Sequence, residues 1–267
     1  RRAWRGPGPA PDRPPTSESP YPMTEAKTRS DIAADFRENG FAIAHDLADA
    51  PLLEEMRSVY DGMLDGSIPC PGTDRDLGGL TRQIMLPHIH HPLFAHNAAI
   101  DSAKEIAAKL IGCADPQFFF SMLIYKPPGH PHETPWHMDM AYAAMPMTPA
   151  GTSWPNDVVA QFWLALDDVD DDMGCMQFIP RVQNGSMPPH RVASGAPDDD
   201  GRLLAIEDPA AWLPLDAAIK CPLPAGSATV HGYATPHYTG PNRSDRGRRA
   251  YIFSFADMAR LGSLTAR

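Results

Sequence analysis

The sequence predicts a mostly β domain, a sandwich or barrel of short strands with helices packed on its outside. Two observations predict this class. Helix-type segments occupy the first part of the chain, and short runs rich in β-branched and aromatic residues follow from residue 118 onward. The length of 267 residues is compatible with one domain, because all-β barrels and sandwiches of this size are often undivided.

The N-terminal stretch differs in composition from the rest of the chain. Residues 1–22 hold seven prolines and no apolar run long enough for a signal peptide or a membrane anchor. A composition of this kind is typical of a disordered segment. We therefore predict a disordered N-terminal extension over residues 1–22 and one folded domain over residues 23–267.

Three helices are expected between residues 29 and 112. The segments 29–40 and 97–112 both end in glycine, as helices often do, and the segment 50–66 has a proline in its first turn. Apolar residues recur at helical spacing in this middle segment. The face predicted to be buried comprises Leu52, Met56, Val59 and Met63.

Short strand-type runs make up most of the remaining chain. One run precedes the second helix at 41–47, and five more follow the third helix, at 118–126, 157–166, 174–180, 226–232 and 249–256. The intervening segment 188–214 is rich in Pro, Asp, Gly and Ala, which predicts a long insertion or lid loop.

Charge and cysteine content narrow the class of partner. The chain has 23 basic and 33 acidic residues, a net charge of −10, and no basic stripe in its body. This balance argues against nucleic acid and against an anionic membrane as partner, and no segment reaches 18 apolar residues. A small-molecule or protein partner is expected. The four cysteines are widely spaced and form no C-x-x-C pair, which predicts reduced thiols in a cytoplasmic protein.

The stretch "PWHMDMAY" at 135–142 contains a histidine and an aspartate two residues apart. In an extended segment, His137 and Asp139 share one face and Met138 lies on the other. Two histidines and one carboxylate with open positions form the facial triad of non-haem Fe(II) oxygenases. Without further context a His-x-Asp pair is usually a surface or hydrogen-bonded pair, so a third ligand is needed.

Two more histidines and an arginine supply that context. The stretch "TVHGYATPHYTGPN" holds His231 and His237, either of which could complete the site, and Arg248 follows eleven residues after His237. A guanidinium matches a carboxylate in a two-pronged geometry. The pattern therefore favours a metal site with a nearby carboxylate-binding arginine.

The chain resembles the phytanoyl-CoA dioxygenase family of Fe(II)/2-oxoglutarate oxygenases. The resemblance runs in order through "FRENGFAIA", "YKPPG", "WHMD", "DVVAQFWLALDDVDDDMGCMQFIP", "PAGSATVHG" and "HYTGPNRSDRGRRA", and it covers most of residues 33–256. It implies a double-stranded β-helix, or jelly roll, as the core. The sequence departs from the family in "IPRVQNGSMPPH" at 179–190, where many members carry Gly-Ser-His after the proline.

The resemblance also implies roles for individual residues. The implied iron ligands are His137, Asp139 and His237. The implied 2-oxoglutarate contacts are Arg248, Thr239, Trp163 and Lys126. Two of these residues have ordinary alternatives, because a tryptophan inside an apolar strand usually belongs to the core and a lysine at a strand end is usually solvated.

Family behaviour implies a reaction as well as a site. Fe(II), 2-oxoglutarate and O2 would together yield succinate and CO2 while a C–H bond of the substrate is hydroxylated. Related halogenases have a small residue in place of the carboxylate ligand, whereas Asp139 fills that position here. Hydroxylation of a small-molecule metabolite is therefore the expected outcome.

Strand alternation distinguishes two neighbouring arginines. If "RRAYIFSF" is a strand, Arg248 shares a face with Ala250 and Ser254, while Arg249 shares the other face with three aromatic residues. The face with small residues leaves room for an acid inside the barrel. Arg248 is therefore predicted to bind 2-oxoglutarate, and Arg249 to reach solvent past the outer helices.

A second histidine pair supports an alternative from another class. His130 and His132 resemble the start of a cupin metal motif, but the glutamate expected a few residues later is missing, since Glu133 comes too early. A cupin-type isomerase or a non-catalytic binding protein would use this pair in place of His137 and Asp139.

Overall fold

The computed structural model describes residues 29–76, 81–143, 148–183, 185–193 and 203–265. The predicted extension over residues 1–22 lies outside the described residues. The helices are α1 (Arg29–Asn39), α2 (Ala50–Asp65), α3 (Ala98–Ile111), α4 (Pro209–Trp212) and α5 (Met258–Thr265). The strands are β1 (Phe41–Ala44), β2 (Asp74–Asp76), β3 (Arg82–Met85), β4 (Gln117–Lys126), β5 (Thr134–His137), β6 (Val159–Ala165), β7 (Met176–Phe178), β8 (His190–Val192), β9 (Leu204–Ile206), β10 (Ile219–Cys221), β11 (Ala228–His231), β12 (His237–Thr239) and β13 (Arg248–Ala256).

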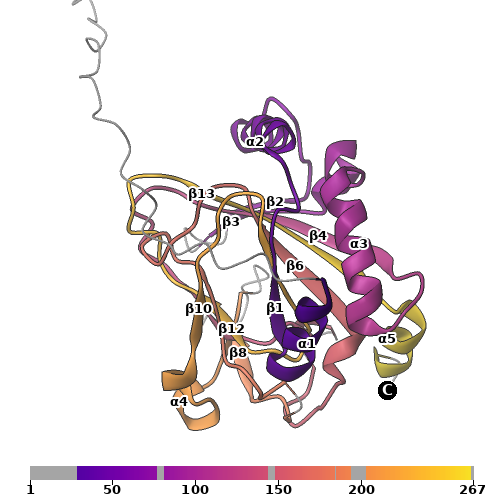
Figure 1. Cartoon of the computed structure of the whole chain (residues 1–267). Helices are drawn as coiled ribbons and strands as arrows, with labels where there is room; N and C mark the ends of the chain where they lie inside the picture. Colours follow the sequence, from indigo (N-terminus) through magenta and orange to yellow (C-terminus); the bar gives the residue numbers. More distant parts are fainter. Residues whose placement is uncertain (1–28, 77–80, 144–147, 184, 194–202, 266–267) are drawn as a thin grey trace, which may run out of the picture.

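Two antiparallel sheets form the body of the domain (Figure 1). The larger has seven strands in the order β1-β11-β6-β13-β4-β3-β2, and the smaller has four in the order β10-β7-β12-β5. Apart from the consecutive strands β2, β3 and β4, neighbouring strands in each sheet are not consecutive in the chain, which crosses repeatedly from one sheet to the other. This arrangement is a jelly roll, and the predicted fold class is confirmed.

The outer face of the larger sheet is covered by α1, α2 and α3. Phe162 and Leu164 of β6 and Tyr251, Phe253 and Phe255 of β13 pack there against apolar residues of these helices. The buried face of α2 was only half predicted. The residues buried on it are Leu53, Met56, Tyr60 and Met63, so Leu53 and Tyr60 replace Leu52 and Val59, which are only partly buried.

The inner face of the larger sheet packs against the smaller sheet. Trp163, Ala250 and Ile252 from the larger sheet belong to one buried cluster with Met176 and Phe178 from β7. Strand alternation sends Phe162 of β6 and the three aromatic residues of β13 to the helices, while Trp163, Ile252 and the smaller or polar residues face this interior. The interior therefore holds polar side chains that come from both sheets.

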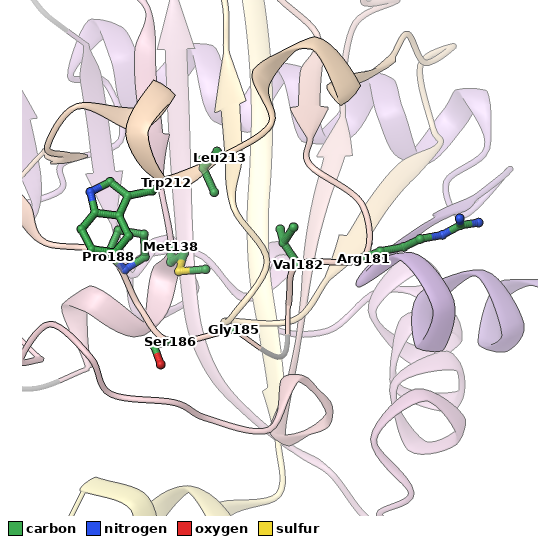
Figure 2. A pocket seen from close by; sticks show the side chains of 8 residues that line it. All are labelled: Met138, Arg181, Val182, Gly185, Ser186, Pro188, Trp212 and Leu213. Carbon is green, nitrogen blue, oxygen red and sulfur yellow. The ribbon is translucent and has the colours of Figure 1, made fainter.

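The segment 188–214 was expected to be a long insertion or lid loop, and its described part contains regular secondary structure where an irregular loop was expected. Strands β8 and β9 pair in a hairpin, and α4 follows them; residues 194–202 lie outside the described residues. A cavity of about 400 Å3 lies beside this segment (Figure 2). Its lining includes Met138, Pro188 and Trp212, which lie close together in the view, with Arg181 and Val182 further along.

Among the described helices, none combines the length and the apolar composition that crossing a membrane requires.

Candidate active site

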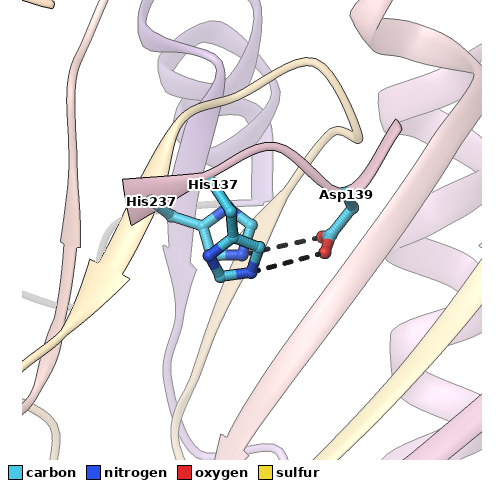
Figure 3. A group of neighbouring side chains, drawn as sticks. All are labelled: His137, Asp139 and His237. Atoms are coloured by element: carbon cyan, nitrogen blue, oxygen red, sulfur yellow. Dashed lines mark ion pairs between the residues drawn. The ribbon is translucent and has the colours of Figure 1, made fainter. Parts of the chain in front are cut away.

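Three predicted ligand residues meet at the junction of β5 and β12 (Figure 3). His137 is the last residue of β5 and is opposed to His237, the first residue of β12. Asp139 begins a short 3-10 turn (Asp139–Tyr142). Because the backbone of Met138 is extended, the carboxylate of Asp139 lies on the same side as the two imidazoles. One donor atom from each of the three residues lies within 4.8 Å of the others.

The hydrogen bonds of the two histidines leave the metal-facing nitrogens free. Nδ1 of His137 lies 2.7 Å from the carbonyl oxygen of Pro135, and Nδ1 of His237 lies 2.9 Å from that of Thr235. A carbonyl oxygen can only accept, so each Nδ1 carries the hydrogen and each Nε2 presents a lone pair. Burial lowers the pKa of both imidazoles, which keeps them neutral and able to bind a metal.

The carboxylate of Asp139 completes the donor set. Its Oδ1 lies 3.8 Å from Nε2 of His137, and its Oδ2 lies 3.7 Å from Nε2 of His237. Burial alone would raise the pKa of Asp139, but the surrounding imidazoles outweigh burial and hold this pKa below its ordinary value. Two imidazoles and one carboxylate fit Fe(II), and three protein ligands leave positions open for other molecules.

His231, the alternative third ligand, has a different place. Its Nε2 lies 3.2 Å from Oδ2 of Asp139, but His231 is outside the group whose donor atoms converge within 4.8 Å. The donor set therefore favours His237 as the third ligand.

Two cationic side chains, Lys126 and Arg248, are buried close to the triad. Thr239 lies two residues after His237 on β12, and its hydroxyl accepts a hydrogen bond of 3.1 Å from the amine of Lys126. Lys126 is fully buried, so the expectation of a solvated strand-end lysine was wrong. Arg248 is opposed to Lys126 across β13 and β4 and is 1% exposed.

Neither of these buried cations forms an ion pair with an acidic side chain of the described residues. Lys126 also donates to the carbonyl of Gly240 at 2.7 Å, and Nη1 of Arg248 donates to that of Gly174 at 2.6 Å. The Nε of Arg248 is buried and has no hydrogen-bond partner among the described residues. Burial lowers the pKa of Lys126 and lowers that of Arg248 to about 10, so an anion such as a carboxylate beside these two side chains would offset the cost of burying their charges.

Trp163 is part of the core and also contacts Arg248. Its ring belongs to the cluster between the sheets, and the guanidinium carbon of Arg248 lies 5.4 Å from the ring centroid. Such a cation–π contact fixes the long arginine side chain along the inner face of β6.

Strand alternation on β13 is as predicted. Arg248 points inward, while Arg249 lies on the opposite face and binds Asp61 and Asp167 at 2.8 and 3.1 Å. Its side chain is 22% exposed, so it is held by acidic partners at the surface more than it reaches into solvent.

The histidine pair of the cupin alternative lies elsewhere. The rings of His130 and His132 are 5.5 Å apart, but neither residue belongs to the converging group found among the described residues. The observed donor set supports the His137 site over the His130 site.

Comparison with known proteins identifies the family. The family model described as phytanoyl-CoA dioxygenase (PhyH) matches residues 36–250, most of the chain. The chain is 27% identical over 177 residues to phytanoyl-CoA dioxygenase domain-containing protein 1 of Rattus norvegicus, which covers 64% of this chain and 55% of that protein. It thus spans about half the length of the curated relatives it matches.

Solved structures agree with this assignment. EvdO2 from Micromonospora carbonacea var. aurantiaca, complexed with 2-oxoglutarate, superposes with a TM-score of 0.69 and 30% identity, covering 84% of this chain and 89% of EvdO2. The epimerase SnoN, at 20% identity and a TM-score of 0.65 over 86% of this chain and 83% of SnoN, shows the same fold.

Fold and donor set together define a jelly-roll domain with a two-histidine, one-carboxylate site that fits Fe(II). The chain belongs to the phytanoyl-CoA dioxygenase family.

Three residues beside the triad were not predicted from the sequence. Gln161 of β6 donates to Asp139 at 2.5 Å, Ser254 of β13 donates to Gln161 at 2.8 Å, and Nε2 of His190 accepts from the backbone of Met138 at 3.1 Å. Gln161 and Ser254 are polar residues on the inward face of apolar strands, and that pattern is visible in the sequence. His190 lies in the segment expected to be a loop and carries no comparable signal.

Proposed function

We propose that this protein hydroxylates an unactivated C–H bond of a small-molecule metabolite and converts 2-oxoglutarate and O2 to succinate and CO2. The observation that carries the proposal is the placement of two neutral histidines and a carboxylate beside two buried cations, Lys126 and Arg248, that form no ion pair with an acidic side chain in the described part of the chain. When bound at His137, Asp139 and His237, Fe(II) would supply the activation of O2.

The distance between the triad and the two buried cations suits a short dicarboxylic acid. Trp163, which contacts the guanidinium of Arg248, lies two residues along β6 from Gln161, which contacts Asp139. Two residues of strand span about 7 Å. A five-carbon dicarboxylate can therefore place one carboxylate on Arg248 and Lys126 and direct its 2-oxo acid end toward the metal.

The buried residues Arg248, Lys126 and Thr239 would contribute to binding of the cosubstrate. Arg248, with Lys126 and Thr239, would bind and orient the distal carboxylate, and the desolvated surroundings strengthen that pairing. The apolar cluster around Trp163 would exclude water from this end of the cosubstrate.

The surface arginines near the site support a small substrate over a CoA thioester. Arg249 is bound by Asp61 and Asp167, and Arg246 lies 3.9 Å from Asp170. Cations already paired with acids are poorly placed to bind the phosphates of CoA. The resemblance to EvdO2, which binds 2-oxoglutarate, supports the cosubstrate and leaves the substrate open.

The test of class is spectroscopic. Anaerobic addition of Fe(II) and 2-oxoglutarate together should give a weak visible charge-transfer band that neither gives alone. His137→Ala should abolish the band, whereas His130→Ala/His132→Ala should retain it. The opposite ranking of these variants would favour the cupin-type site.

The test of outcome follows from Asp139. Substrates from a metabolite panel are screened for stimulated succinate release, and the products are analysed by mass spectrometry with and without chloride. A gain of one oxygen atom without chloride supports hydroxylation. A chlorinated product, or a product without added oxygen, contradicts it.

A further inference from the structure

A row of three polar side chains crosses the middle of the larger sheet directly behind Asp139. Gln161 on β6 is opposed to His231 on β11 and to Ser254 on β13. Cross-strand partners on one face of a sheet lie side by side. All three residues are buried and face the interior where the triad lies.

The row makes its contacts with a single atom of the triad. The amide nitrogen of Gln161 lies 2.5 Å from Oδ2 of Asp139, and Nε2 of His231 lies 3.2 Å from the same oxygen. Ser254 donates to the amide oxygen of Gln161 at 2.8 Å. Because the carboxylate of Asp139 can only accept, the NH2 group of Gln161 faces Asp139, and the amide oxygen faces the hydroxyl of Ser254.

The tautomer of His231 follows from the same contacts. A carboxylate oxygen accepts, so Nε2 of His231 carries the hydrogen when it binds Asp139, and Nδ1 is the unprotonated nitrogen. Nδ1 is buried and finds no hydrogen-bond partner in the described part of the chain, which agrees with a nitrogen that has no hydrogen to donate. In this state Nε2 has no lone pair for a metal.

Oδ1 of Asp139 differs from Oδ2. Among the described residues no side chain donates a hydrogen bond to Oδ1, whereas Oδ2 receives two. From this asymmetry we propose that Gln161, oriented by Ser254, and His231 are positioning residues that occupy Oδ2 and present Oδ1 alone to the metal. This inference rests on the metal site of the proposed function.

Binding through one oxygen has a consequence for the reaction. A carboxylate that turned to bind through both oxygens would take one of the three positions that the protein ligands leave open. A 2-oxo acid chelate and O2 together need three. The row therefore protects the coordination position that the cosubstrates require, and it fixes the carboxylate before the metal arrives.

The experiment measures Co(II) and Fe(II) affinity anaerobically, followed by titration of 2-oxoglutarate into the Fe(II)-loaded protein. Gln161→Met fills the same space without a donor, and His231→Phe does likewise. Each should weaken metal binding roughly 10- to 100-fold, the usual effect of removing a group that orients a ligand. Thr229→Val is the matched control, because Thr229 is buried on the same strand and face as His231 and has no hydrogen-bond partner among the described residues. This substitution should leave metal affinity unchanged.

A double-mutant cycle separates positioning from general loss of packing. Ser254 acts through Gln161, so Ser254→Ala should weaken Co(II) binding in the wild-type chain and have no further effect in Gln161→Met. Additive effects of the two substitutions would overturn the proposed row. Circular dichroism of each metal-free variant checks that it is folded.

The failures of the two proposals are distinguishable. If the wild-type chain binds no Fe(II) or Co(II), or binds it as well after His137→Ala, the proposed function fails. If the wild-type chain binds the metal through His137 and folded Gln161→Met and His231→Phe bind it within about twofold of wild type, the metal site stands and the positioning row is wrong.

Discussion

At the scale of single residues, the site depends on where each buried polar group finds its partner. The two ligand histidines and His190 each bond a carbonyl two residues earlier in the chain through Nδ1. This local contact sets the tautomer and frees Nε2, for a metal at His137 and His237 and for the backbone of Met138 at His190. Short-range geometry thus prepares groups that only the tertiary fold brings together.

The two arginines at the start of β13 should differ sharply on substitution. Arg248→Ala removes the buried guanidinium proposed to bind the distal carboxylate of 2-oxoglutarate. Loss of such a desolvated charge pair should cost about 2–5 kcal/mol of binding free energy. The apparent KM for 2-oxoglutarate should rise by roughly 30-fold or more. Arg249→Ala should change this KM only a few-fold, because Arg249 faces Asp61 and Asp167 outside the interior. Steady-state titrations in which Arg249→Ala has the larger effect would contradict the assignment.

His190 should make stability depend on acid pH. Burial lowers the pKa of His190 from 6.5 to about 4, so below pH 6.5 the unfolded chain binds a proton that the folded chain does not. Its contribution is complete above pH 6.5 and is lost as the pH falls toward 4. The advantage of wild type over His190→Gln in free energy of unfolding should shrink by roughly 2–3 kcal/mol between pH 7.5 and 4.5.

Urea denaturation of the metal-free proteins at both pH values measures this difference. The other buried histidines are common to both chains, so their titration cancels in the comparison. A difference between wild type and variant that is the same at pH 7.5 and 4.5 would show that His190 is protonated in the folded protein.

At the scale of elements, long segments follow their sequence patterns and short ones follow their neighbours. Helices α2 and α3 begin at side-chain caps, Asp49 and Asn97, and each ends at a left-handed glycine. Strands β5 and β12 have only four and three residues and exist because they pair with each other beside the triad. Periodicity cannot identify strands of this length.

The turn before β11 offers a test of how the elements are joined. Gly226 has φ +91°, its carbonyl accepts from Leu47 and Ala48, and a Cβ there would lie 2.3 Å from the carbonyl oxygen of Ala48. Gly226→Ala combines left-handed strain with a clash against backbone and should lower the free energy of unfolding by about 2–5 kcal/mol.

Gly66→Ala is the matched control for this substitution. Gly66 caps α2 with φ +83°, and nothing lies within 4 Å of its added Cβ. Only the backbone strain of about 1–2 kcal/mol should appear in chemical denaturation. Equal losses for the two variants would mean that the close approach to Ala48 is relaxed at little cost.

At the scale of the whole molecule, two groups of side chains lie between the two sheets. One is an apolar cluster, and the other is the polar site. The cluster contains Trp163 and Phe178, whereas the triad brings together groups whose burial is costly without a ligand. Binding of a metal and an anion should therefore stabilise the entire fold.

Thermal unfolding measures that stabilisation. At a hundredfold excess over its Kd, each ligand adds about 2.7 kcal/mol, so anaerobic Fe(II) with 2-oxoglutarate should raise the Tm by roughly 10–20 °C at about 2–4 °C per kcal/mol. His137→Ala should lose most of the shift with both ligands. A shift with 2-oxoglutarate alone that equals the shift with both would contradict a cosubstrate site that includes the metal.

The sequence by itself indicated the family and, through that resemblance, the jelly roll and the three residues that converge in the triad. Glycine helix ends and hydrophobic spacing indicated the long helices, because these are local properties of the chain. Alternation also separated Arg248 from Arg249 before any contact was known. Tertiary structure alone decided that Lys126 is buried, that Leu53 and Tyr60 replace Leu52 and Val59 on α2, and that segment 188–214 forms a hairpin and a short helix.

The same division holds inside the site. His137 and Asp139 are two residues apart, so their meeting follows from local backbone geometry. Gln161, His231 and Ser254 are at least 23 residues apart, and they meet at Asp139 because β6, β11 and β13 are hydrogen-bonded in one register. Register is set by the packing of whole strands against both layers, so no spacing in the sequence reveals which polar residue will face which ligand.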